Sequence, residues 1–135
     1  MRAALVHLAL GFTFGALLSA RAITLPPDTA RLLPAHMEML LVGWTIQLAM
    51  GVGYWILPRL AVAAPAGSRA PRGLYGNQAP AWAAFVLLNA GVLMVGVAPF
   101  GALPGALTAW GRAAELAAAL AFGLTAWPRV KPPSV

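Results

Sequence analysis

The chain has 135 residues, of which 61% are hydrophobic and only 9% are charged, and its mean hydropathy is +0.79. Soluble domains carry about a quarter charged residues, so this composition excludes an ordinary soluble domain and indicates an integral membrane protein. Because the chain has no cysteine, disulfides, thiolate metal sites and iron–sulfur clusters are excluded. The net charge of +6 is spread between apolar stretches rather than gathered in one patch, which argues against nucleic-acid binding.

Apolar stretches long enough to cross a bilayer lie near residues 3–20, 35–57, 79–100 and 105–127. Crossing the hydrocarbon core takes about twenty helical residues. In lipid, a helix is the structure that satisfies the backbone of a single isolated segment. We therefore expect an all-α protein with one domain over residues 1–135, in which four transmembrane helices form an antiparallel bundle.

The basic residues predict the orientation of this bundle. Most of them lie before the first stretch, between the second and third, or after the fourth: Arg2, Arg59, Arg69, Arg72, Arg129 and Lys131. Basic residues favour the cytoplasmic side of a membrane. We expect both termini in the cytoplasm of a prokaryotic cell, the helices in its inner membrane, and His36 near the outer face.

The first stretch is similar to a secretory signal peptide, because Arg2 precedes an apolar run that ends in small residues at 19–22. We expect it to be retained as a short span. His7, Gly11 and Gly15 share one face, and glycines spaced by four residues let two helices approach closely. For His7 we favour a packing role. The alternatives are a second site, such as a proton or ligand path, or a ligand to heme.

The second stretch carries a polar stripe on one helical face. Its members recur at steps of three and four residues: His36, Met39 or Leu40, Gly43, Gln47, Met50 and Tyr54. A histidine followed by glycine leaves space for a flat macrocycle, and the soft methionines suit the surface of such a ring. The stripe is consistent with heme iron held by His36. The alternative is a histidine in the headgroup region, with Gly43 only permitting close packing.

Three charged residues fall within the predicted spans: Glu38, Arg112 and Glu115. Charges inside a membrane usually face the bundle interior and pair with one another. Arg112 and Glu115 are three residues apart and so are neighbours on a helix surface. One interpretation is a polar network of these three side chains. The other is that Arg112 binds a heme propionate, because its planar guanidinium matches a carboxylate.

The second stretch also resembles the second transmembrane helix of the catalytic subunits of heme-copper oxidases and nitric oxide reductases. The resemblance rests on His36 near the helix start and on Gly51, Tyr54 and Pro58 at its exit. It continues more weakly into the third stretch, at Trp82, Phe85, Asn89 and Gly91. It implies that His36 is an axial ligand of heme b. The stripe then predicts Met39, Gly43 and Gln47 as further heme contacts, and Arg112 is the predicted partner of a propionate.

The resemblance implies a small heme-b protein of a respiratory or denitrification chain, which binds or passes a diatomic gas such as nitric oxide or transfers electrons. With two histidines the chain lacks the ligands of a binuclear centre, so we do not expect it to reduce oxygen or nitric oxide. His7 and His36 should lie roughly 20 Å apart along the membrane normal. A second axial ligand would then come from a homo-oligomer, either a dimer or a trimer. The alternative is a cofactor-free accessory or assembly subunit of a larger respiratory complex.

Overall fold

The computed structural model of the chain describes residues 2–20, 27–59 and 77–130, and every regular element in these ranges is helical. The first long helix is α1 (Arg2–Ser19), and the second is a continuous run of several segments. In chain order this run is η1 (Pro27–Arg31), α2 (Leu32–Glu38), the π-helical segment η2 (Met39–Ile46) and α3 (Gln47–Ile56). The remaining elements are α4 (Ala79–Val97), η3 (Ala98–Phe100), α5 (Pro104–Ala126) and η4 (Trp127–Arg129). Arg69, Arg72 and Lys131, which contribute to the predicted orientation, lie outside the described residues.

Three helical stretches are long and apolar enough to cross a membrane: Arg2–Ser19, Thr29–Ile56 and Ala79–Phe100. These confirm the first three predicted spans by length and composition. The fourth predicted span, near residues 105–127, forms the helix α5 but does not reach the same apolarity among the described residues. This helix carries both Arg112 and Glu115, so its passage through a bilayer depends on how those charges are paired.

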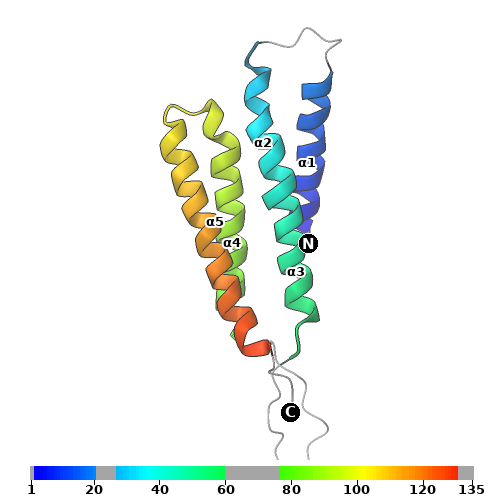
Figure 1. Ribbon diagram of the computed structural model, residues 1–135, viewed down its shortest axis with the longest axis vertical. Helices are drawn as coiled ribbons and strands as arrows, with labels where there is room; N and C mark the ends of the chain where they lie inside the picture. Colours follow the sequence, from blue (N-terminus) through cyan, green and yellow to red (C-terminus); the bar gives the residue numbers. More distant parts are fainter. Residues whose placement is uncertain (1, 21–26, 60–76, 131–135) are drawn as a thin grey trace, which may run out of the picture.

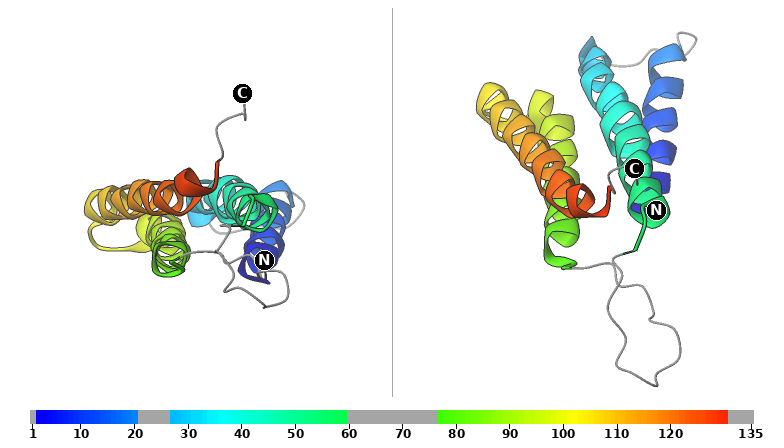
Figure 2. Two further views of the ribbon diagram at one scale, coloured as in Figure 1. Left: turned by 90° about the horizontal axis from the view of Figure 1, so that it is seen from below. Right: turned by 60° about the horizontal axis from the view of Figure 1, so that its bottom comes forward.

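The helices lie in two side-by-side pairs (Figure 1). In each pair the chain rises along one helix and returns along the next: α1 lies beside the α2–α3 run, and α4 lies beside α5. The pairs meet where α2 and η2 contact α4, and Figure 2 shows the same grouping from two further directions. The first helix starts beside α3, above the lower end of that helix. This offset sets which residues of the two helices face each other.

Glycines allow α1 to lie directly against the second helical run. A Cβ atom added at Gly11 would come 2.5 Å from Leu40 Cδ2, and one added at Gly15 would come 2.7 Å from His36 Cε1. Real Cβ atoms do not approach side chains so closely, so neither position accommodates a larger residue without movement. The predicted close approach at the Gly11 and Gly15 face is confirmed.

A second glycine contact joins α4 and α5. A Cβ atom at Gly91 would lie 2.8 Å from the Gly111 carbonyl oxygen, and one at Gly111 would lie 3.0 Å from the Gly91 carbonyl oxygen and 2.6 Å from Val95 Cγ2. Each glycine therefore faces the backbone of the opposite helix, which a side chain cannot displace cheaply. Close packing between membrane helices relies on such small residues because lipid supplies little hydrophobic drive for association.

Arg129, just after α5, forms hydrogen bonds with backbone carbonyls at the end of α3 and so links the two helix pairs. Its side chain is only 1% exposed. Nε donates to the Pro58 carbonyl at 3.0 Å, and Nη2 donates to the carbonyls of Tyr54 at 2.8 Å and Leu57 at 2.6 Å. The guanidinium also lies 5.0 Å from the centre of the Tyr54 ring. The last carbonyls of a helix have no partner within it, and a cation is favourable at that end. Arg129, expected only as an orientation signal, caps α3.

Gly111→Ala should destabilise the fold because the added methyl group meets Val95 and the backbone of α4. We expect a loss of roughly 1–3 kcal/mol in the free energy of unfolding, typical of overpacking. Gly123→Ala on the same helix is the control, since nothing lies within 4 Å of its added Cβ. It should be neutral or stabilising by up to about 1 kcal/mol. Unfolding in mixed micelles with increasing dodecyl sulfate, followed by circular dichroism, measures both; equal effects would contradict the glycine contact.

Arg129→Leu should lower the stability of the fold by roughly 2–4 kcal/mol, because three helix-end carbonyls lose a charged donor. Arg129→Lys keeps the charge but has fewer donors in a less rigid arrangement, so its loss should be smaller. Thermal unfolding in detergent, followed by the helical signal, compares the three proteins. A leucine variant as stable as the parent would show that this cap does not hold the two pairs together.

Candidate functional site

His36 lies on α2 with its ring held against α1. Nδ1 lies 2.8 Å from the carbonyl oxygen of Gly11, which can only accept a hydrogen bond, so Nδ1 carries the proton. The Nε2 atom of the neutral ring then has a free lone pair. Metal-binding histidines usually donate their other N–H to a carbonyl or carboxylate in this way, which fixes the tautomer and the ring orientation. The half-buried His36 thus has the tautomer that a metal ligand requires.

His7 makes the matching contact in the opposite direction. It projects from α1, is 5% exposed, and its Nδ1 lies 3.0 Å from the Gly43 carbonyl oxygen and 3.1 Å from Gln47 Oε1. Both partners accept from one N–H. A Cβ atom at Gly43 would come 2.7 Å from the His7 ring. The space in front of Gly43, in which we expected one face of a macrocycle, is filled by the His7 imidazole.

The π-helical segment explains why the Gly43 carbonyl is available to His7. The backbone N–H of Gln47 bonds to the carbonyls of Val42 and Trp44 and bypasses Gly43. Such wider turns are rare in helices and occur often at functional positions. Sequence patterns do not register this change of turn, because the residues from Met39 to Ile46 read as ordinary apolar helix.

The depth of His7 differs from the sequence-based expectation. We placed it near the inner end of the bundle, yet it faces Gly43 and Gln47 in the middle of the second run. His36 contacts α1 at Gly11, four residues beyond His7 on that helix. The two rings are thus about one to two helical turns apart in level, closer than the roughly 20 Å expected. The difference arises because α1 starts beside α3, above its lower end, which raises His7 to the middle of the second run.

Met39 lies between the two helix pairs rather than on an open surface. It is 4% exposed, its Cβ lies near Gly11, and its Cε lies 3.2 Å from the position that a Gly96 Cβ atom would take. The thioether therefore fills the junction of α1, η2 and α4. Flexible methionine side chains suit such irregular gaps.

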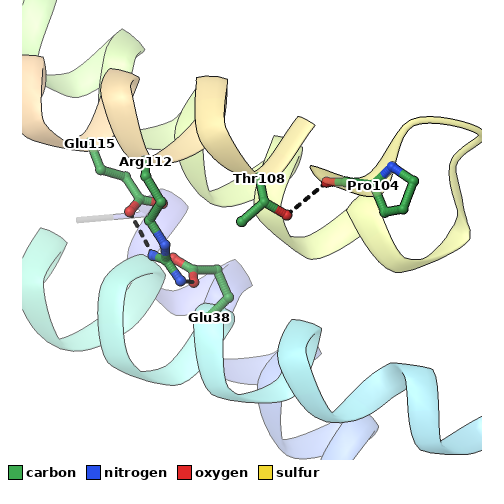
Figure 3. A network of polar contacts seen from close by, with 5 residues as sticks. All are labelled: Glu38, Pro104, Thr108, Arg112 and Glu115. Carbon is green, nitrogen blue, oxygen red and sulfur yellow. Dashed lines mark hydrogen bonds and ion pairs between the residues drawn. The ribbon is translucent and has the colours of Figure 1, made fainter. Parts of the chain in front are cut away.

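Arg112 joins the two pairs by contacting two carboxylates at once. One guanidinium nitrogen lies 2.7 Å from Glu38 Oε2, across the pair boundary, and another lies 2.7 Å from Glu115 Oε2 on its own helix. Figure 3 shows the guanidinium between the two acids. The Glu38 side chain is 4% exposed and that of Glu115 is 11% exposed, whereas that of Arg112 is 52% exposed. The polar network predicted from these three residues is confirmed.

This network leaves acceptor capacity unused. The second carboxylate oxygens, Glu38 Oε1 and Glu115 Oε1, are buried without a hydrogen-bond partner among the described residues. Because Arg112 already serves two carboxylates, a heme propionate would have to compete with both of them for it.

The residues expected around one heme are distributed over separate contacts. Gly43 and Gln47 hold His7, Met39 fills the pair junction, Arg112 holds two acids, and His36 stands against α1. Within the described ranges no group of three or more histidine or acidic side chains is placed to hold a metal ion. Both histidines donate Nδ1–H to a backbone carbonyl, and His36 is the less buried of the two.

Several structural residues escaped the sequence analysis. Gly91 and Gly111 are on different helices, so no spacing within one segment links them, and Arg129 was interpreted only by its charge. A basic residue shortly after a helix-ending proline was the one available signal for a cap. Comparison with protein-family models, with curated proteins and with solved structures finds no significant match to this chain.

Arg112→Met should destabilise the junction between the helix pairs, because two buried carboxylates lose their cation. Breaking a buried ion pair removes several kcal/mol, and the half-exposed arginine reduces this to roughly 1–3 kcal/mol. Adding Glu38→Gln and Glu115→Gln to the same protein should restore part of the loss. Unfolding curves in mixed micelles compare the single and triple variants. Equal stability of all three proteins would contradict a stabilising role for the network.

Proposed function

We propose that the chain is a polytopic protein of a prokaryotic inner membrane, with four helices in antiparallel order and both termini in the cytoplasm. Three apolar stretches of sufficient length support this. The fourth crossing, α5, becomes tolerable in lipid because Arg112 is paired with Glu115 and with Glu38 of the neighbouring pair. Arg2 and Arg59 lie at the end of the bundle that we assign to the cytoplasm.

Within this framework we propose that the protein binds heme b through His36, as the resemblance to heme-copper oxidase and nitric oxide reductase subunits implies. The observation that carries the proposal is the 2.8 Å hydrogen bond from Nδ1 of His36 to Gly11, which leaves Nε2 as a free donor of an electron pair. Gly43, Gln47 and Arg112 do not extend the site, because their contacts are made within the bundle. The ligand set from one chain is then His36 alone.

Heme bound in this way would supply an iron centre for a diatomic gas such as nitric oxide, or for electrons, in a respiratory or denitrification chain. A second copy of the chain in a dimer or trimer would provide a second axial histidine if electron transfer is the role. His7 does not fill that position, because its Nδ1–H and its ring are enclosed between α1 and η2. Reduction of oxygen or nitric oxide is not proposed, since the chain has only two histidines.

The second candidate is an accessory or assembly subunit without a cofactor, packed against a larger respiratory membrane complex. Its support is that most of the polar residues in the spans connect helices to each other: His7 with Gln47, and Arg112 with Glu38 and Glu115. In this alternative the Nδ1 contact of His36 is one more link between α1 and α2.

The visible spectrum of protein purified after expression with added heme separates the two candidates. We expect a Soret band that is lost in His36→Ala and retained in Met37→Ala, a control on the exposed side of the same helix. A shift with carbon monoxide would indicate an open iron site and gas handling, and an insensitive low-spin spectrum would indicate two axial ligands and electron transfer. A protein without a Soret band would overturn heme binding and favour the accessory subunit.

A further inference from the structure

A cavity of about 520 Å³ lies between the two helix pairs, below the level of His7. Its walls come from α1, α3, α4 and α5, and they include the aromatic side chains of Trp82, Phe85 and Phe122. The Gln47 side chain lies at one end of the cavity, and Arg2 and Gln78 lie toward the other. The cavity is thus apolar along its length and polar at its ends, as small-molecule sites often are.

Gln47 lines this cavity, and its side-chain amide carries a donor without a partner among the described residues. Its Oε1 atom must face His7, because the His7 N–H is shared between Gln47 and the acceptor-only Gly43 carbonyl. The NH₂ group is then directed away from His7. This Nε2 atom is buried and has no hydrogen-bond partner among the described residues, and Gln47 is 7% exposed. A buried amide donor left unpaired is unfavourable, so a bound acceptor would stabilise the protein.

The depth of Gln47 restricts the kind of acceptor. Gln47 is the first residue of α3, which ends at Ile56, so the amide lies nine residues and about 13 Å from the lower helix end. Half of a hydrocarbon core is about 15 Å thick, so ester carbonyls of phospholipids at the boundary do not reach this level. A neutral lipophilic molecule with its own carbonyl group does, because it dissolves in the hydrocarbon core.

We propose that the cavity binds a lipid-soluble quinone, with one quinone carbonyl accepting a hydrogen bond from Gln47 Nε2. The aromatic side chains of α4 and α5 suit a flat ring, for which offset or edge-on aromatic contacts are favourable. The volume accommodates the ring and the beginning of an apolar tail, which leaves toward the bilayer. The proposal concerns binding and does not depend on heme at His36.

Full-length protein in phosphatidylcholine nanodiscs, titrated with a decyl-substituted benzoquinone, tests the proposal. Nanodiscs captured by a tag on the protein are extracted with solvent, and the quinone is quantified against empty nanodiscs. We expect saturable binding of one quinone per chain. Ala81→Trp fills the cavity and should abolish binding, whereas Ala83→Trp, an exposed position on the same helix that does not line the cavity, should leave it unchanged.

Gln47→Leu removes the donor, while His7 keeps the Gly43 carbonyl as its acceptor. The dissociation constant should rise roughly three- to tenfold, the effect of one neutral hydrogen bond. If this variant fails to fold by circular dichroism, the tryptophan pair decides the question alone. His36→Ala should bind the quinone normally, which separates this site from the proposed heme. Uptake no greater than that of empty nanodiscs, uptake equal in Ala81→Trp and Ala83→Trp, or a co-purified phospholipid that the quinone does not displace would overturn the proposal.

Discussion

The packing of the bundle depends on the close approach of α1 to the second helical run. There, a histidine of each helix donates a hydrogen bond to a backbone carbonyl of the other helix. His36 donates to Gly11, and His7 donates to Gly43, at neighbouring levels of the same interface. Both contacts exist only because a glycine is present where the ring must lie. In a bilayer, a buried imidazole N–H without an acceptor would be unfavourable. Each histidine therefore depends on the glycine beside its ring, because that glycine lets the ring reach a carbonyl of the other helix.

The two helix pairs are joined by polar contacts at two levels. Arg112 connects α5 to Glu38 of α2 in the upper part, and Arg129 binds the carbonyls at the end of α3 in the lower part. Both arginines come from the second pair and reach into the first. Along the second run, the cavity-lining residues Gln47, Met50, Gly51 and Tyr54 fall between Glu38 and Leu57. The cavity therefore lies between the levels of these two polar contacts.

Several polar atoms within the helices are not used in these contacts, and two of them belong to the proposed ligand sites. Nε2 of His36 retains a lone pair, and Nε2 of Gln47 retains a donor. One atom suits a metal, and the other suits a carbonyl oxygen. Both side chains face α1, but they lie eleven residues apart along the second run, so a heme and a quinone would occupy separate levels of the same small protein.

The sequence by itself determined the membrane class and the approximate helix bounds, because apolar length is a property of each segment alone. It also indicated that Gly11 and Gly15 favour close packing and that Arg112 and Glu115 are neighbours, since spacing on a helix fixes which residues share a face. Only the tertiary structure decided the partners across helices. The vertical offset of α1 places the His7 ring against Gly43, where the sequence predicted open space. In the π-helical segment the Gln47 N–H does not bond to the Gly43 carbonyl, and this carbonyl accepts a hydrogen bond from His7. The level of one helix relative to another and a π-helical turn do not alter the spacing of residues in a sequence. The sequence therefore cannot distinguish a heme site at Gly43 from a histidine packed against it.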